Sequence, residues 1–106
     1  MVLNYKIAFS DRALQDINDI CDYITDMFHN PDAANNHRAD FIRIAYSLQR
    51  IPQRNTLLYI GKRQSKHRRQ RVKNYYLYYI ILEKEKEIEI TTVQSCRRDI
   101  KNVGIN

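Results

Sequence analysis

The residues of this sequence best suited to chemistry lie in one basic segment, residues 62–73. It holds seven Lys and Arg residues and His67, and no Asp or Glu. The 106-residue chain has 18 Lys and Arg against 12 Asp and Glu, a formal net charge of +6. Without the seven basic residues of the segment, 11 Lys and Arg would stand against 12 Asp and Glu, so the net positive charge resides in this segment. Clustered cations neutralise phosphates, which predicts a polyanion-binding surface; a solvated loop that only keeps the protein soluble is the alternative. The candidate binding residues are Lys62, Arg63, Lys66, Arg68, Arg69, Arg71 and Lys73.

Three arginines are candidate catalytic residues for phosphate chemistry. Arg71 comes just before a strongly apolar segment, and Arg97 and Arg98 follow the next predicted strand. Antiparallel pairing would bring these positions toward one end of a sheet, where three guanidiniums can stabilise a phosphate undergoing transfer. The alternative is surface ion pairing with Asp99 or with the aspartates of the first predicted helix. No obvious general base accompanies the arginines in the sequence.

Other catalytic patterns are absent from the sequence, which has no Gly-rich phosphate loop, CxxC or HExxH motif. His29, His37 and His67 are scattered over a helix junction, a helix surface and the basic segment. This scatter predicts no metal site and makes His37 a solvated helix residue. Cys21 lies on an apolar helical stripe and Cys96 follows a strand, so both are expected to be reduced thiols. We therefore expect neither a metal nor a cofactor.

Alternating apolar residues predict an N-terminal strand over residues 3–9. Two helices are expected to follow this strand and to hold the candidate site residues in place. Ser10 is a good N-cap for the first helix, and Pro31 interrupts it. A second helix begins near Asp32 and is stopped by Pro52. The first apolar stripe comprises Leu14, Ile17, Ile20, Cys21, Ile24, Met27 and Phe28, opposite Asp16, Asp19, Asp22 and Asp26; the second comprises Ala34, Phe41, Ile44, Ala45, Leu48 and Ile51.

The remaining half of the chain is predicted to be β. A short strand is expected over residues 57–60, and residues 75–82 are apolar or aromatic at every position, which is typical of a central strand. Residues 87–92 alternate on a returning strand. We expect most tyrosines of the central strand to be core residues rather than platforms for base stacking. Residues 96–106 are polar and show little core-forming pattern.

The predicted architecture is therefore α+β. Its order is β-α-α-β-β-β, with a helical hairpin on one face of an antiparallel sheet, as a single domain over residues 1–106. No apolar run approaches the ~18 residues needed to cross a bilayer, and the chain begins directly with a strand-like pattern. We therefore expect a cytoplasmic protein with no membrane partner.

The order of several short motifs resembles the RelE/ParE superfamily of bacterial type II toxin–antitoxin toxins, and in particular its ParE branch. After the N-terminal strand these motifs are SDRALQDINDICDYI, NPDAANNH, SLQRIP, an R-x-x-x-Y-x-x-x-Y strand at Arg71, Tyr75 and Tyr79, and ITTVQSCRRD. Together they span nearly the whole chain. The resemblance implies a compact α/β toxin, neutralised by a co-expressed antitoxin whose extended or helical C-terminal segment wraps it.

Departures from the family pattern bear on the target. Ser95 stands where ParE-like chains commonly have His, and neither Tyr nor His follows Glu89, although many RelE-like endonucleases rely on a C-terminal Tyr or His. General acid–base catalysis typically contributes about 10²–10⁴-fold, so its loss would be severe. The resemblance thus implies ParE-like poisoning of DNA gyrase by binding, without hydrolysis.

Two alternatives stay open. The first is a ribosome-dependent mRNA endonuclease that uses Arg71, Arg97 or Arg98, and the second is a diverged, inactive toxin. The basic segment would then face a gyrase–DNA complex, the ribosome and its mRNA, or an acidic antitoxin. Operator DNA is expected to be contacted only through the antitoxin.

Overall fold

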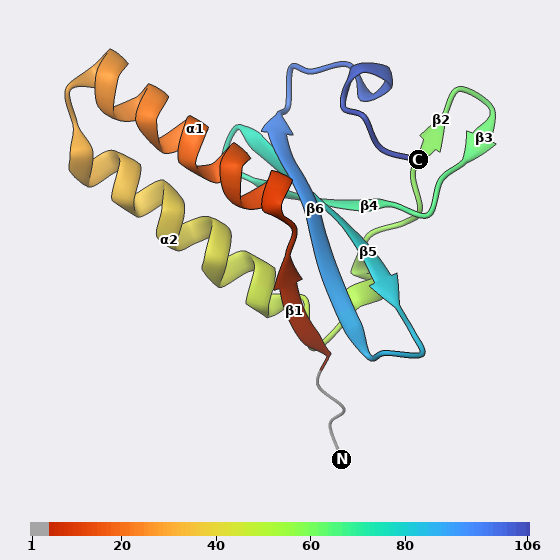
Figure 1. Ribbon diagram of the computed structural model, residues 1–106. Coiled ribbons are helices and arrows are strands. Elements are labelled where there is room, and N and C mark those ends of the chain that lie inside the picture. Colours follow the sequence, from red (N-terminus) through yellow and green to blue (C-terminus); the bar gives the residue numbers. More distant parts are fainter. Residues whose placement is uncertain (1–4) are drawn as a thin grey trace.

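The computed structural model describes residues 5–106, in which a pair of helices packs on a sheet (Figure 1). Leu3, expected in the first strand, lies outside the described residues. Within the described part, neither helix combines the length and apolar character that crossing a membrane requires. The elements are β1 (Lys6–Phe9), α1 (Asp11–Phe28), α2 (Pro31–Ser47), β2 (Tyr59–Ile60), β3 (Arg63–Gln64), β4 (Arg68–Val72), β5 (Tyr75–Leu82) and β6 (Glu87–Ser95), with 3₁₀ turns at Pro52–Arg54 and Ile100–Asn102.

The main sheet has the strand order β1-β6-β5-β4, and β2 and β3 form a separate two-stranded hairpin. Strands β4, β5 and β6 pair antiparallel, whereas β1 runs parallel to β6 at the edge. The helices cover one face of the sheet, and the β2–β3 hairpin and the C-terminal residues lie on the other side (Figure 1). The predicted α+β class with a helical hairpin on one sheet face is confirmed.

Helix α1 begins where the sequence predicts. Ser10 Oγ accepts a hydrogen bond from the Ala13 N–H at 3.0 Å and donates one to Thr91 O at 2.9 Å, so the N-cap also ties the helix to β6. The predicted apolar stripe is longer than the buried one, since Leu14 is 49% and Phe28 65% exposed. Phe28 is exposed because the helical hairpin extends beyond the sheet (Figure 1).

Helix α2 ends at Ser47 rather than at Pro52. The Leu48 N–H donates to Ala45 O at 3.1 Å in a tight final turn, and the chain then leaves the helix direction. Ile51, expected on the apolar stripe, is consequently 61% exposed, which corrects that prediction.

The two faces of the sheet bury different numbers of side chains. Among the described residues, fourteen buried apolar side chains form one cluster on the helix face, including Leu77 and Tyr79, and three form a second cluster on the opposite face, namely Tyr78, Val103 and Ile105. Because side chains alternate along a strand, neighbouring tyrosines of β5 enter different clusters. Tyr78 and Tyr79 are fully buried, as predicted for core residues, whereas the expectation that residues 96–106 add little to the core is wrong.

A C-terminal strap, residues 103–106, crosses the face opposite the helices. The Arg12 guanidinium donates to the carbonyl oxygens of Val103 and Gly104, and the Lys66 N–H donates to Asn106 O at 3.2 Å. Gly104 has φ +82°, a left-handed backbone conformation that favours glycine over residues with a Cβ. The strap therefore joins the start of α1 to the basic segment.

Asp16 has a structural role that its predicted position on the solvent face of α1 did not suggest. Its Oδ2 accepts hydrogen bonds from Thr92 Oγ1, from the Val93 N–H at 3.0 Å and from Gln94 Nε2 at 3.3 Å. One carboxylate thus fixes the end of β6, just before Arg97.

Candidate functional site

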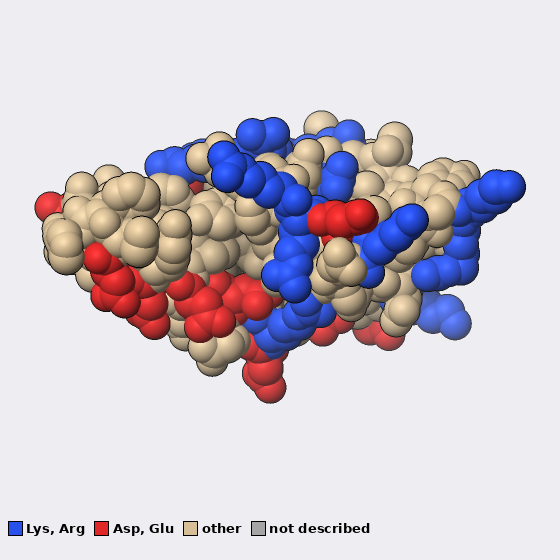
Figure 2. Space-filling model, turned by 90° about the horizontal axis from the view of Figure 1, so that it is seen from above, with Lys and Arg blue, Asp and Glu red and all other residues tan. Residues whose placement is uncertain are grey.

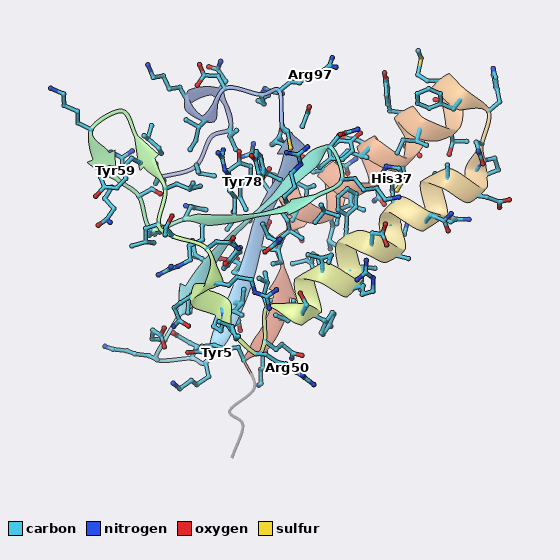
Figure 3. All side chains as sticks on the ribbon, turned by 180° about the vertical axis from the view of Figure 1, so that it is seen from behind. Tyr5, His37, Arg50, Tyr59, Tyr78 and Arg97 are labelled. Carbon is cyan, nitrogen blue, oxygen red and sulfur yellow. The ribbon has the colours of Figure 1, made fainter. Side chains whose placement is uncertain are left out.

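The basic segment is not a single solvated loop, which the sequence left open as the alternative to a binding surface. It forms the turn of the β2–β3 hairpin, where Gly61 has φ +64°, then β3, and then the edge strand β4. Figure 2 shows acidic side chains gathered along one flank of the molecule and basic ones over its centre and far end. Tyr59, 57% exposed, stands on the hairpin at the edge of the molecule, close in sequence to Lys62 and Arg63 (Figure 3).

Two of the seven predicted binding cations are held by polar groups distant in the sequence. Arg68 Nη1 donates to Asn55 O at 2.5 Å, and Lys73 Nζ lies 3.2 Å from Asp40 Oδ2. Hydrogen bonds from Arg43 and Lys73 hold the pKa of Asp40 below its usual value. Arg68 and Lys73 therefore anchor β4 and its turn.

Of the seven, Lys73 alone forms a salt bridge with a described residue; those that do not are Lys62, Arg63, Lys66, Arg68, Arg69 and Arg71.

Arg69 and Arg71 share the face of the sheet opposite the helices. Their guanidinium carbons lie 4.0 and 5.9 Å from the centroid of the Tyr76 ring, distances at which the cations attract the aromatic face. Beside them is an outer-face cavity of about 330 Å³ that is lined by guanidinium and amide groups. Its lining residues are Asn55, Thr56, Leu58, Arg69, Gln70, Arg71 and Tyr76.

His67, the histidine of the basic segment, is buried with both ring nitrogens engaged. Nδ1 lies 3.0 Å from Asn106 O and Nε2 lies 3.1 Å from Thr91 Oγ1. Because a carbonyl oxygen can only accept, Nδ1 carries a proton. Burial, rather than its charged neighbours, chiefly lowers the pKa of His67. This histidine holds the strap and offers no free nitrogen to a substrate.

A larger groove lies under the part of the helical hairpin that extends beyond the sheet. This overhang groove, of about 750 Å³, brings together Arg71 from β4 and Arg97 from beyond β6, as the sequence predicted for two of the three arginines. Arg97 points outward at this end of the molecule (Figure 3). The lining residues are Tyr23, Ile24, Phe28, Ala33, His37, Arg71, Asn74, Tyr75, Ser95, Cys96 and Arg97.

Arg98 does not join the other two arginines in this groove. It lines a neighbouring hollow of about 350 Å³ on the α1 side, and its Nη1 donates to Gln94 Oε1 at 3.4 Å. Neither Arg97 nor Arg98 makes a salt bridge to a described residue, so the alternative of ion pairing with Asp99 or the α1 aspartates is not seen in residues 5–106. Successive residues point in different directions after β6, which explains the separation.

His37 is the residue of this groove that sequence reasoning missed. It was expected to be a solvated helix residue, yet it is half-buried and its ring lies 6.1 Å from Tyr75 and 6.4 Å from Phe41. Its Nδ1 lies 2.9 Å from Ala33 O, so Nδ1 donates and Nε2 keeps a free lone pair in the neutral form. A polar residue beside the apolar stripe of α2 was the available signal, but the proximity of Arg71 and Arg97 arises only from the tertiary fold.

Among the described residues, no three His, Cys, Asp or Glu side chains gather as metal ligands would. The arrangement instead offers two kinds of surface. The hairpin and the outer-face cavity present cations and amides suited to a polyanion, and the overhang groove combines two arginines with aromatic walls.

Comparisons with known proteins extend this description. Residues 7–100 match a family described as the ParE toxin of the type II toxin–antitoxin system, parDE. No curated protein sequence matches the chain.

Three solved structures share the fold. The chromosomal ParDE system of Pseudomonas aeruginosa contains a chain with a TM-score of 0.70 and 15% identity, over 86% of this chain and 95% of that one. A chain of the Mycobacterium tuberculosis RelBE2 complex has a TM-score of 0.65 and 21% identity, over 92% and 97%. A chain of the intact Escherichia coli RelBE complex has a TM-score of 0.61 and 14% identity, over 89% and 99%.

Proposed function

The chain belongs to the ParE family of type II toxin–antitoxin toxins, and from this premise we propose that it arrests growth by binding and poisoning DNA gyrase. The observation that carries the proposal is the make-up of the basic surface. Its free cations suit a protein–DNA complex, whereas its histidine, His67, is buried with both ring nitrogens engaged. Such a surface supports binding better than acid–base catalysis.

The binding surface that we propose consists of the β2–β3 hairpin and the outer face of β4. Lys62 and Arg63 project from the hairpin turn, and Arg69 is held against Tyr76. A short antiparallel ribbon that carries cations can lie along or enter a DNA groove. Gyrase acts on DNA in the cytoplasm, so the proposal also places the chain there.

Purified chain and gyrase with supercoiled plasmid would test the proposal. We expect the chain to trap gyrase–DNA cleavage complexes, seen as linear plasmid after denaturation. Arg63→Glu should need roughly tenfold more protein for the same effect, about 1.4 kcal/mol, because a cation that contacts phosphate becomes repulsive.

Lys84→Glu is the control, because Lys84 is also exposed but lies in the β5–β6 turn, outside the β2–β3 hairpin and β4. No trapped complexes at concentrations that stop growth would overturn the gyrase proposal.

One observation favours the alternative of a ribosome-dependent mRNA endonuclease. His37 keeps Nε2 free in the same groove as Arg71 and Arg97, which supplies a base beside two guanidiniums. This alternative predicts codon-positioned mRNA cuts that are lost on Arg71→Ala and on His37→Ala. Intact transcripts during growth arrest would exclude it.

We infer that an antitoxin neutralises the chain. Two of the similar structures are toxin–antitoxin complexes, RelBE2 and RelBE. Exposed apolar side chains at the end of α1, such as Met27 at 60% and Phe28 at 65%, offer a protein-binding surface outside the basic segment. Any contact with operator DNA would then be made through the antitoxin.

A further inference from the structure

The β2–β3 hairpin is attached to the rest of the molecule at its base. It pairs with no described strand of the main sheet, and its turn presents Lys62 and Arg63 to solvent. At the base, the Ser65 N–H donates to Leu58 O at 2.7 Å, and the Leu58 N–H donates to His67 O at 2.9 Å. These two hydrogen bonds close the hairpin, so its direction relative to the sheet depends on what packs against the base.

The C-terminal strap supplies that packing. Val103 and Ile105 of the strap are buried in one cluster with Tyr78 of β5. Leu58, just before β2, and Ile60, within β2, pack against the same cluster. Apolar side chains of the strap therefore lie between the main sheet and the base of the hairpin.

The end of the strap is also bonded to the end of the hairpin. Asn106 O accepts a hydrogen bond from the Lys66 N–H at 3.2 Å and one from His67 Nδ1 at 3.0 Å. His67 Nε2 in turn lies 3.1 Å from Thr91 Oγ1 of β6. The orientation of the hairpin therefore follows the position of the strap.

Arg12, the second residue of α1, holds the strap at its other end. Its Nη1 donates to Gly104 O at 3.3 Å and its Nη2 donates to Val103 O. Its Nε lies 4.0 Å from Asp16 Oδ2, an atom that accepts three hydrogen bonds from β6. The planar guanidinium thus fixes two successive strap carbonyl groups relative to α1 and β6.

We propose that Arg12 is a positioning residue for target binding. It acts through the strap, which sets the direction in which Lys62 and Arg63 of the hairpin point. The proposal rests on the proposed function and deepens it, because it names the residue that orders the proposed binding surface before the target arrives. A hairpin that is held in one orientation binds more tightly, since less conformational freedom is lost on binding.

Three variants of the full chain test this role. Arg12→Gln removes the guanidinium, and Arg12→Lys keeps the positive charge and N–H donors. Arg50→Gln is the control, because it removes one exposed positive charge just after α2, well away from Tyr59 of the hairpin (Figure 3).

Amide hydrogen exchange measures the hold on the hairpin without any target. In Arg12→Gln we expect the Lys66 N–H, which donates to Asn106 O, to exchange about tenfold faster, with the amides of α2 and β5 unchanged. Arg12→Lys should show a smaller increase, and Arg50→Gln should show none.

Affinity for a short DNA duplex, measured by fluorescence anisotropy over a series of salt concentrations, separates positioning from direct contact. Arg12→Gln should bind about tenfold more weakly, with the slope of log Kd against log salt concentration unchanged. A direct phosphate contact by Arg12 would instead reduce that slope by about 0.9. The concentration that traps half of the gyrase–DNA cleavage complexes should rise by a similar factor, and Arg12→Lys should restore part of both losses.

A double-mutant cycle shows whether Arg12 acts through the hairpin. In an Arg63→Gln background, Arg12→Gln should weaken duplex binding much less than it does in the unmodified chain, because the hairpin has already lost a contact that Arg12 positions. Full additivity of the two substitutions would overturn the proposal.

The positioning role is also wrong if the Lys66 N–H exchanges at an unchanged rate in Arg12→Gln, or if the salt slope falls. An equal loss of affinity in Arg50→Gln would assign the effect to net charge and would likewise exclude it. If the unmodified chain traps no gyrase–DNA complexes, the proposed function fails, and hydrogen exchange still decides whether Arg12 holds the hairpin. The two failures are therefore distinguishable.

Discussion

The two faces of the sheet are built in different ways. On the helix face, fourteen buried side chains form one apolar core, with Phe41 and Leu77 fully buried. On the opposite face, a cluster of three buried apolar side chains joins Tyr78 to the C-terminal strap, which is held by hydrogen bonds from Arg12, Lys66 and His67. The helix face supplies the stability, whereas the thinly covered face presents the cations that we propose for target binding.

The position of the basic segment therefore depends on polar contacts more than on core packing. The strap touches the segment through Asn106 O, which accepts from the Lys66 N–H and lies 3.0 Å from His67 Nδ1. Hydrogen bonds contribute about 0.5–1.5 kcal/mol each, much less than a large buried side chain. The target-binding face should therefore loosen under conditions that leave the helix face intact.

Truncation of one core residue on each face tests this comparison most strongly. Phe41→Ala should lower the free energy of unfolding by about 3–5 kcal/mol, because it leaves a cavity under α2. Val103→Ala removes two methylene equivalents and should cost about 1.5 kcal/mol. Urea unfolding followed by circular dichroism measures both. Equal losses would show that the strap belongs to the main core.

Acidification should act on the strap side through His67. Its pKa is lowered in the folded state mainly by burial, with Lys66 lowering it further and Asn106 and Glu89 opposing the shift. The unfolded chain, with an ordinary pKa of about 6.5, therefore binds more protons below that pH. Stability should be full above about pH 6.5 and fall as the pH drops toward the folded pKa.

Urea unfolding of the chain and of His67→Gln, measured between about pH 7.5 and 5, checks this sign. The variant keeps a donor and an acceptor but does not titrate, so its curve should be flatter over this range. Parallel curves for the two proteins would mean that His67 does not distinguish the folded from the unfolded state.

The helix face could be predicted from the sequence, and the other face could not. Ile17, Cys21 and Ile24 recur at helical spacing and are buried because periodicity reports directly on one face of a helix. The strap offers no such pattern, since Val103 and Ile105 stand among polar residues and are buried where hydrogen bonds from Arg12, Lys66 and His67 hold the chain.

The candidate site could likewise be predicted from the sequence only in part. Charge alone located the basic segment, but it did not show that Arg68 and Lys73 are engaged by Asn55 and Asp40 while Arg69 and Arg71 lie over the Tyr76 ring. Asn55 and Asp40 lie at least thirteen residues away in sequence from the cations that they engage, and the tertiary fold brings them together. His37 was missed for the same reason.

The smallest expected effect concerns two neighbouring hydroxyl groups, one on each face of the sheet. Tyr79 Oη, on the helix face, donates to Pro52 O at 2.7 Å and accepts from Asn55 Nδ2 at 3.2 Å. Tyr78 Oη, on the strap face, is buried with no hydrogen-bond partner in the described residues. Tyr79→Phe should therefore lower the free energy of unfolding by about 1–2 kcal/mol.

Tyr78→Phe should leave the free energy of unfolding unchanged or raise it by up to about 1 kcal/mol, because it removes a desolvated hydroxyl and no hydrogen bond. The two substitutions delete the same atom from adjacent residues of β5, so the difference between them isolates the polar environment of each face. If Tyr78→Phe destabilises the protein as much as Tyr79→Phe, the Tyr78 hydroxyl has a hydrogen-bond partner in solution. The polar groups of the strap face would then be paired as fully as those of the helix face.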